Sequence, residues 1–282
     1  MNENIVGIDS AIFMHPKIWK ASGHVDGFAD PMIDNKDSKK RYRADNLLED
    51  KIARYIKDGK TEKAQELQNA MYQALEADNL PALKELIEQH EIVCPVSGTR
   101  NWTDVRQFNL MFSTQMGAMA EGSDEVYLRP ETAQGIFVNF LNVQKSGRMR
   151  IPFGIAQIGK AFRNEVIARQ FIMRMREFEQ MEMQFFVKPG TEMEWYNHWK
   201  ESRLKWHLAI GTPEDKYRFH DHVKLAHYAN AAVDIEFEFP FGFKEVEGIH
   251  SRTDFDLSQH EKFATRNFNI SILLRIKIMS LM

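Results

Sequence analysis

The sequence has one cysteine, little excess charge and no long apolar segment. Cys94 alone cannot form an intrachain disulfide, which favours a reducing compartment. The formal net charge of -3 gives no general attraction to polyanions. We find no apolar run of about 18 residues, the length that a membrane helix needs, and no signal peptide. We therefore expect a cytoplasmic protein without a membrane anchor.

The residues that are present are typical of a globular chain, with 43% apolar and 27% charged residues. Between Leu47 and Ile92 apolar residues recur at helical spacing among Lys, Glu, Gln and Ala. This pattern predicts an insertion of two or three helices. After it, Cys94-Pro95-Val96-Ser97-Gly98 looks like half of a zinc knuckle. One thiolate cannot hold a structural zinc, so we expect no metal there.

Alternating residues between Gly159 and Phe186 predict two strands joined by a loop. In the first strand Arg163 and Glu165 share one face. The polar face of the return strand comprises Arg174, Arg176, Phe178, Gln180, Glu182 and Gln184, and the opposite face carries Met175, Met181, Met183 and Phe185. One side of the predicted hairpin is therefore apolar, and the other is rich in groups that bind ligands.

The polar face has the chemistry to hold a nucleotide beside an amino acid. A guanidinium binds phosphate through two parallel charge-assisted hydrogen bonds. A carboxylate such as Glu165 accepts from an exocyclic amine, and the Phe178 ring offers a stacking surface for a base. Further along, Gln180 and Glu182 suit an ammonium group. The alternative interpretation is a solvated hairpin whose Arg and Glu side chains pair only with each other.

Three blocks of sequence resemble one known family. Phe162–Glu165 and Arg176–Glu182 resemble motif 2 of the class II aminoacyl-tRNA synthetases, in the form found in homodimeric glycyl-tRNA synthetases. The blocks Leu128–Gly135 and Glu245–Arg252 support this, and the resemblance extends from about Ile5 to about Phe263. It implies an α+β fold, in which an antiparallel β-sheet is flanked by helices and interrupted by a helical insertion.

The resemblance also divides the chain. Residues 1–45 correspond to the N-terminal part of a catalytic domain with the end of motif 1, residues 46–92 to the helical insertion, and residues 93–265 to the catalytic core with motif 2. Residues 266–282 fit neither a strand nor a helix period. We expect an aberrant tail there, from a frameshift or a truncated gene product. The motif 1 helix, motif 3 and the anticodon-binding domain would then be missing.

The function implied by the resemblance is the ATP-dependent attachment of glycine to tRNA(Gly) through glycyl-adenylate, with Mg²⁺, by a homodimer. Arg163 and Glu165 would be the catalytic residues. The residues implied in ATP binding are Arg163, Asn164, Glu165, Met173, Arg174, Met175, Arg176, Glu177, Phe178, Glu245 and Val246. Those implied in glycine binding are Arg43, Glu131, Phe178, Glu179, Gln180, Met181 and Glu182.

Individual roles follow from the same resemblance. Arg163 would hold the α-phosphate, Glu165 the adenine amino group, and Phe178 would stack on the ring. Glu131 would meet the substrate ammonium and Arg43 its carboxylate; the alternative for Arg43 is a surface arginine before the next helix. Because larger amino acids are easily excluded by the bulk expected near Met181, we expect no editing site.

Two carboxylates also suggest a metal site. Glu245 and Glu247 are two residues apart in a predicted strand and would share one face, where they suit Mg²⁺ beside a triphosphate. Asp254, Asp256 and His260 could imitate a metal cluster, although a polar loop is the simpler interpretation.

Other functions stay open at this point. The basic segments Lys36–Arg43 and Lys145–Arg150 are candidates for contacting tRNA or are simply solvated. The chain could be a non-catalytic fragment that binds ATP or a partner without charging tRNA. It could also be a class II-like paralogue that activates a different acid.

Overall fold

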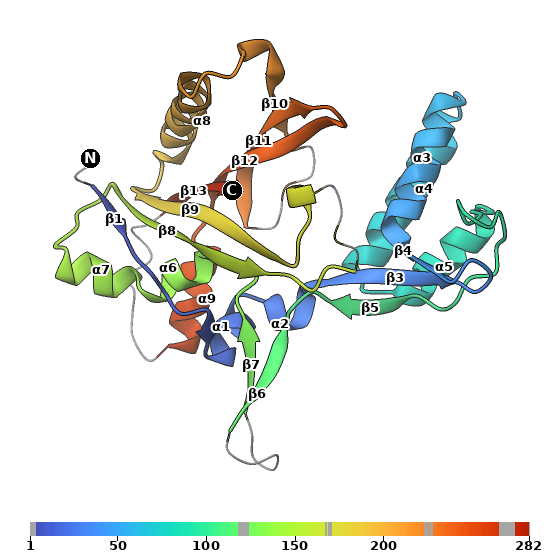
Figure 1. The fold of residues 1–282 in the computed structure, drawn as a ribbon, viewed down its shortest axis with the longest axis horizontal. Helices are drawn as coiled ribbons and strands as arrows, with labels where there is room; N and C mark the ends of the chain where they lie inside the picture. Colours follow the sequence, from blue (N-terminus) through green and yellow to red (C-terminus); the bar gives the residue numbers. More distant parts are fainter. Residues whose placement is uncertain are drawn as a thin grey trace. The chain divides into compact units, whose positions relative to one another are not determined.

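The structure is a computed structural model that describes residues 4–117, 124–166, 168, 171–222, 225, 228–264 and 274–281. It divides into two compact units (Figure 1). The sheet unit comprises Met1–Gly27 and Met111–Met282, and the insertion unit comprises Phe28–Leu110. Each unit has its own hydrophobic core. No helix in these described ranges is long and apolar enough to cross a membrane.

A seven-stranded sheet forms the centre of the sheet unit. In their order across the sheet, its strands are β1 (Ile5–Gly7), β8 (Phe153–Phe162), β9 (Glu177–Val187), β13 (Leu274–Leu281), β12 (Gly242–Arg252), β11 (Ala229–Phe239) and β10 (Tyr217–Asp221). Strand β1 runs parallel to β8, and all the other neighbours are antiparallel. This confirms the predicted fold class.

Helices cover both faces of this sheet (Figure 1). Because side chains alternate along a strand, Phe186 of β9 faces one way and Phe185 the other. Phe186 packs with Phe153 and Ile155 of β8 against α6 (Ala133–Val138), α7 (Phe140–Ser146) and α9 (Phe255–Phe263). Phe185 packs with Ile235 and Ile249 against α8 (Glu192–Ala209). Each buried aromatic or aliphatic side chain stabilises the fold by about 1.5–3 kcal/mol.

A smaller sheet and short helices complete the sheet unit. The small sheet has the order β2 (Phe13–Met14), β7 (Asp124–Leu128) and β6 (Ser113–Met116). The short helices are α1 (Pro16–Ala21), α2 (His24–Gly27), η1 (Phe171–Met173) and η2 (Glu214–Lys216). Helix α1 packs on α9 and α6. It begins with proline in its first turn, where no amide hydrogen is needed.

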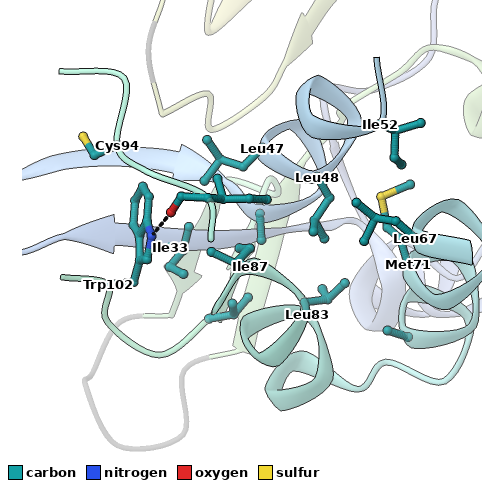
Figure 2. Packing of buried hydrophobic residues seen from close by; sticks show 14 of the residues in the cluster. Ile33, Leu47, Leu48, Ile52, Leu67, Met71, Leu83, Ile87, Cys94 and Trp102 are labelled. Atoms are coloured by element: carbon teal, nitrogen blue, oxygen red, sulfur yellow. Dashed lines mark hydrogen bonds between the residues drawn. The ribbon is translucent and has the colours of Figure 1, made fainter. Parts of the chain in front are cut away.

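The insertion unit contains the predicted helices and three strands as well. The helices are α3 (Ala44–Lys57), α4 (Thr61–Glu76) and α5 (Leu80–Gln89), and the strands form a sheet in the order β4 (Lys40–Arg43), β3 (Ala29–Asn35) and β5 (Arg106–Asn109). Figure 2 shows their shared core, in which the Trp102 Nε1 donates to the carbonyl of Ile92 at 2.9 Å. The helical insertion is confirmed, and its compact unit is wider than residues 46–92.

The C-terminal segment differs from the prediction. Leu274–Leu281 forms strand β13 and pairs antiparallel with both β9 and β12, so the prediction of no strand in this segment is wrong. The sequence does alternate here, with Leu274, Ile276 and Ile278 separated by Arg275 and Lys277. The alternation is interrupted where Met279 follows Ile278 with no polar residue between them, which hides the strand period of this segment. Residues 265–273 and 282 lie outside the described ranges.

Candidate functional site

A short loop, Arg129–Thr132, crosses the β8–β9 hairpin and joins two of the three sequence blocks. The buried Arg129 guanidinium donates from Nε to the carbonyl of Lys160 at 2.6 Å and from Nη1 to that of Ser10 at 2.8 Å. The Phe162 amide donates to the Arg129 carbonyl at 2.9 Å. Gly159 is required here, because an added Cβ would lie 2.4 Å from Arg129 Nη2. The loop is thereby fixed on the hairpin.

Beyond this loop, three polar side chains of β9 are fully buried. Gln180, Glu182 and Gln184 point to one face of the sheet, as their spacing predicted. The Thr132 amide donates to Gln180 Oε1 at 3.0 Å, and the Thr132 hydroxyl donates to Glu182 Oε2 at 2.8 Å and lies 3.3 Å from Gln180 Oε1. Gln184 donates to Glu182 Oε1 at 2.6 Å. The Glu182 carboxylate is therefore held on both oxygens by neutral donors.

The predicted nucleotide residues lie at the loop end of the hairpin, where β8 ends and β9 begins. Arg163 stands 5.3 Å from the centroid of the Phe178 ring, and its Nε donates to the Pro130 carbonyl at 3.1 Å. Arg174 pairs with the Glu165 carboxylate at 3.1 Å. The guanidinium, the ring and the loop thus meet at one place. Strand β8 ends at Phe162, so Arg163 to Val166 lie after it and not within it. The Arg163 amide still donates a hydrogen bond to the carbonyl of Arg176 at 2.9 Å.

Arg176 differs from Arg163 in its contacts. Its Nε donates to the Glu165 carbonyl at 2.8 Å and its Nη2 to that of Val166 at 3.1 Å. Arg174 and Arg176 therefore hold the backbone and side chain around Glu165. Asn164 is half-buried between Arg163 and Glu165.

Several predicted residues point away from Gln180 and Glu182. Glu179 and Met181 alternate with them along β9 and so lie on the opposite face. Glu177 and Glu179 there pair with Lys160 at 3.2 and 3.8 Å. Met181 therefore lies on the face opposite Glu182, as its spacing predicted, and its implied role in glycine binding stays a prediction. Before β9, Met173 is half-buried and Met175 is exposed.

A buried polar network brings in the third sequence block. Gln134 donates from its one amide nitrogen to Glu131 Oε1 at 3.0 Å and to Asp256 Oδ1 at 3.1 Å. Its amide oxygen lies 2.7 Å from His260 Nε2. Asp256 accepts from Arg252 Nη2 at 2.7 Å. Asp256 and His260 of α9 therefore converge on Gln134, which in turn contacts Glu131, and Arg252 at the end of β12 holds Asp256.

Arg252 links this network electrostatically to the hairpin. Burial disfavours its charge, but the nearby carboxylates of Asp256, Glu131 and Glu182, together with Tyr228, raise the pKa of Arg252 above its ordinary value. The guanidinium lies 3.9 Å from the centroid of the Tyr228 ring. On the face of the sheet that carries Glu182, three carboxylates thus lie near the buried guanidinium of Arg252.

Glu245 and Glu247 do not share a face. The register of β12 against β11 shifts between them, since Glu247 pairs with Ile235 and Glu245 with Glu236. Val246 is the extra residue of this β-bulge. Cross-strand partners point to the same side, and Ile235 and Glu236 point to opposite sides. The prediction of a shared face is wrong, because strand alternation is interrupted at Val246.

Glu247 is committed to an internal ion pair. Its fully buried carboxylate accepts hydrogen bonds from Nε and Nη2 of Arg203 at 2.5 and 3.2 Å and lies 2.8 Å from His207 Nε2. Both Arg203 and His207 belong to α8. The pair Glu245 and Glu247 therefore does not fit a magnesium ion held between them. Among the residues that the structure describes, no group of three or more His, Cys, Asp or Glu side chains is arranged to hold a metal ion.

Arg43 belongs to the insertion unit, at the N-cap of α3. Its guanidinium binds Asp30 at 3.0 Å and both oxygens of Asp45 at 2.6 and 3.1 Å. Two carboxylates thus fix its orientation, so Arg43 is more than a loose surface arginine.

Sequence reasoning missed the residues that hold the site together. Thr132, Gln134 and Arg252 received no role, although all three stand inside the matching blocks. Asp256 and His260 were weighed only as metal ligands. The available signal was a polar residue at an inward position of a helix that otherwise buries Ile136 and Phe137.

Two family models match the chain. The tRNA synthetase class II core domain (G, H, P, S and T) covers residues 112–268, and the glycyl-tRNA synthetase insertion domain 1 matches residues 30–66 and 59–110. The residues matched by the insertion-domain model correspond to the insertion unit, Phe28–Leu110.

Curated proteins named glycine–tRNA ligase are similar along nearly the whole chain. That of Chlorobaculum tepidum is 55% identical over 269 residues, which are 94% of this chain and 57% of the relative. That of Staphylococcus haemolyticus is 54% identical over 93% of this chain and 55% of its own length. The chain therefore spans about half the length of these relatives.

Among solved structures, the cytoplasmic serine–tRNA ligase of Naegleria fowleri in complex with AMP aligns at a TM-score of 0.47 and 18% identity, over 60% of this chain and 36% of its own. Family assignment depends on the sequence matches, of which the class II core alone covers more than half of the chain. The chain belongs to the class II aminoacyl-tRNA synthetases and, by its insertion domain and its relatives, to the glycyl-tRNA synthetase family.

Proposed function

We propose that this chain contains the site at which glycine is activated by ATP and then transferred to tRNA(Gly). The observation that carries the proposal is the convergence of Arg163 and Phe178 at the loop end of the hairpin, next to the buried Gln180 and Glu182. A phosphate-binding guanidinium and a stacking ring are thereby adjacent to groups that suit an ammonium. The names of the relatives support glycine as the amino acid.

In the first step, a carboxylate oxygen of glycine attacks the α-phosphorus of ATP. A bond forms between that oxygen and phosphorus, and the bond from phosphorus to the pyrophosphate oxygen breaks. The products are glycyl-adenylate and pyrophosphate. No protein nucleophile is needed, because positioning and neutralisation of charge carry the reaction. In the second step the terminal ribose hydroxyl of tRNA attacks the glycyl carbonyl, and AMP leaves.

The nucleotide would lie across the loop end of the hairpin. Arg163 would bind the α-phosphate, Phe178 would stack on adenine, and Glu165 would accept from the adenine amino group. Arg174 is paired with Glu165 in the present arrangement, so it would have to keep that carboxylate in place or exchange partners when ATP binds. Asn164, Met173, Met175, Arg176, Glu177, Glu245 and Val246 would shape the remaining ATP cavity.

The amino acid would lie deeper, on the Glu182 side of the sheet. Its ammonium would meet Glu131, Gln180 and Glu182, in a pocket where little solvent competes. Because Glu182 already has donors on both oxygens, it would supply charge more than a new hydrogen bond. Arg43 is our candidate for the substrate carboxylate.

Location and partners belong to the same proposal. A cytoplasmic enzyme is supported by the single cysteine, and homodimerisation is supported only by the family resemblance. Mg²⁺ would enter with ATP as its counter-ion.

Glycine-dependent exchange of radioactive pyrophosphate into ATP tests the proposal. We expect exchange with glycine and none above background with alanine or serine. Arg163→Ala should abolish it, whereas Arg150→Ala, at an exposed arginine of the same unit, should leave it unchanged. No exchange with any amino acid would favour a non-catalytic fragment, and exchange with another acid would identify a paralogue.

A further inference from the structure

Gln134 occupies a position at which only a carboxamide satisfies all the neighbours. It is 1% exposed, and its nitrogen faces two carboxylates, Glu131 and Asp256. Its oxygen faces the Nε2 of His260. The reversed amide would place an oxygen between two carboxylates, which is repulsive and would leave buried groups unsatisfied. The orientation of the amide is therefore determined by its surroundings.

The partners of Gln134 are themselves fixed. Asp256 is bound by Arg252 at 2.7 Å, and both side chains are almost completely buried. His260 packs against Phe137 with ring centroids 6.3 Å apart. These contacts leave Gln134 little freedom, because moving it would unpair buried polar groups.

Glu131 is the member of this network that approaches the surface. Its side chain is 14% exposed, compared with 3% for Asp256 and 4% for Arg252. It lies directly before Thr132, which binds Gln180 and Glu182. The rigid interior of the unit thus ends in one partly exposed carboxylate beside the proposed amino-acid pocket, and its Oε1 also lies 3.7 Å from His24 Nε2.

We infer that Gln134 is a positioning residue for amino-acid activation: by holding Glu131 Oε1 at 3.0 Å, with Asp256 and His260 orienting its amide, it sets the carboxylate that receives the substrate ammonium. Since Glu131 has this task only if the chain activates an amino acid, the role of Gln134 rests on the proposed function.

Two adenylate analogues separate this role from a merely structural one. Glycyl-sulfamoyl-adenosine carries the ammonium, and propionyl-sulfamoyl-adenosine has the same size with a methyl group in place of the ammonium. Binding of both, and of AMP, would be measured calorimetrically with the whole chain. We expect wild type to prefer the glycyl analogue. Gln134→Met, of similar length and without hydrogen bonds, should weaken binding of the glycyl analogue about tenfold and change that of the other two less than about twofold.

A double-mutant cycle supplies the matched control. Glu131→Gln, at the least buried position of the network, should also lower the preference for the ammonium. In that background Gln134→Met should have no further effect, because the carboxylate that it positions is gone. Gln144→Met, at a half-buried glutamine of α7, should leave all three affinities unchanged.

The outcomes are distinct. If wild type binds both analogues equally, the proposed function fails. If wild type prefers the glycyl analogue and Gln134→Met keeps that preference, Gln134 does not position Glu131. Equal loss for all three ligands would also overturn its role, since that result indicates general distortion. If Gln134→Met does not fold, as judged by AMP binding, Gln134→Asn replaces it: this side chain keeps the neutral carboxamide but is one methylene too short to hold Glu131 Oε1, and the same loss of preference is expected.

Discussion

The two units bury different kinds of side chain. The core of the insertion unit is apolar, with Leu48, Leu67 and Ile87 packed between three helices and a small sheet (Figure 2). The sheet unit has apolar clusters too, but it also buries Glu182 and Glu247 among other charged and amide groups. Burial of such groups is costly unless each finds a partner.

The difference indicates what each unit was selected to do. An apolar core tolerates exchange of one hydrophobic side chain for another of similar volume. A buried polar network tolerates little, because removing one member leaves its partner unpaired in a low dielectric. The insertion unit therefore owes its shape to packing, whereas the sheet unit uses part of its stability to hold polar groups in fixed positions.

The largest effect is expected at Glu247, on the face of the sheet away from the proposed pocket. Glu247→Ala would leave Arg203 and His207 without the carboxylate that they share. Breaking a buried ion pair in this way costs about 3–5 kcal/mol. Urea unfolding followed by hydrogen exchange in peptides of β11 and β12 would measure it.

A surface pair on the same helix is the control for Glu247. Glu201 and Lys205 are 3.7 Å apart and 72% and 77% exposed, so Glu201→Ala should cost less than about 0.5 kcal/mol. Equal effects of the two changes would show that Glu247 is not an internal ion pair in solution.

The insertion unit should respond to loss of volume. Leu48→Ala removes a completely buried side chain of α3 and should cost about 2–5 kcal/mol in that unit. Hydrogen exchange in α3, α4 and α5 would report the loss. Ile56→Ala, in the same helix but 59% exposed, should change stability by less than about 0.5 kcal/mol. A sheet unit destabilised as much as the insertion unit would contradict separate cores.

Gly159 tests the close contact beneath the loop Arg129–Thr132. Gly159→Ala would place a methyl group against Arg129, which is buried and bound to two carbonyls, so it cannot move freely. Overpacking of this kind costs about 1–3 kcal/mol. Gly7→Ala is the control in β1, because nothing lies within 4 Å of its added Cβ. Thermal unfolding of the two variants would separate them, and equal midpoints would exclude the clash.

The sequence was sufficient for the fold class, the hairpin and the helical insertion, because each has a regular period or a family motif. Alternation along β9 placed Gln180 and Glu182 together correctly. The same alternation failed at Glu245 and Glu247, since a one-residue bulge at Val246 leaves no mark in the pattern. Assigning residues to a face by their spacing assumes that the strand pairs with its neighbour without a bulge.

The contacts of the site were less accessible to sequence reasoning. Gln134 joins Glu131 to Asp256, which is 122 residues further along the chain than Gln134. This contact depends on how α6 and α9 pack. No local pattern encodes such a pairing. Likewise the period of the segment Leu274–Leu281 does not predict a strand, because its pairing with β9 and β12 is a property of the whole sheet.

Cys94 gives the smallest expected effect and the finest test of how the insertion unit treats a buried polar group. Burial raises the pKa of the thiol, but hydrogen bonds from Ser38, Ser97 and Tyr42 outweigh it and bring the pKa to about 6, from an ordinary 9.0. The Ser38 and Tyr42 hydroxyls each lie 3.3 Å from the sulfur. The fold therefore stabilises the thiolate, in a unit that buries few polar side chains besides Asn35 and Asp45.

Because the folded pKa lies below the unfolded value, the thiolate contributes its full stabilisation above about pH 9 and loses it as the pH falls towards 6. Urea midpoints of the insertion unit should thus rise between pH 6 and pH 9 in wild type, and rise less in Cys94→Ser. His90, whose pKa burial lowers, titrates in both proteins and cancels in the difference. Ser38→Ala removes one hydrogen-bond donor to the sulfur, so the pKa of Cys94 should rise and the gain in stability between pH 6 and pH 9 should be smaller. Parallel pH profiles for wild type and Cys94→Ser would mean that the thiol stays protonated over this range, and that the hydrogen bonds from Ser38, Ser97 and Tyr42 do not stabilise a thiolate.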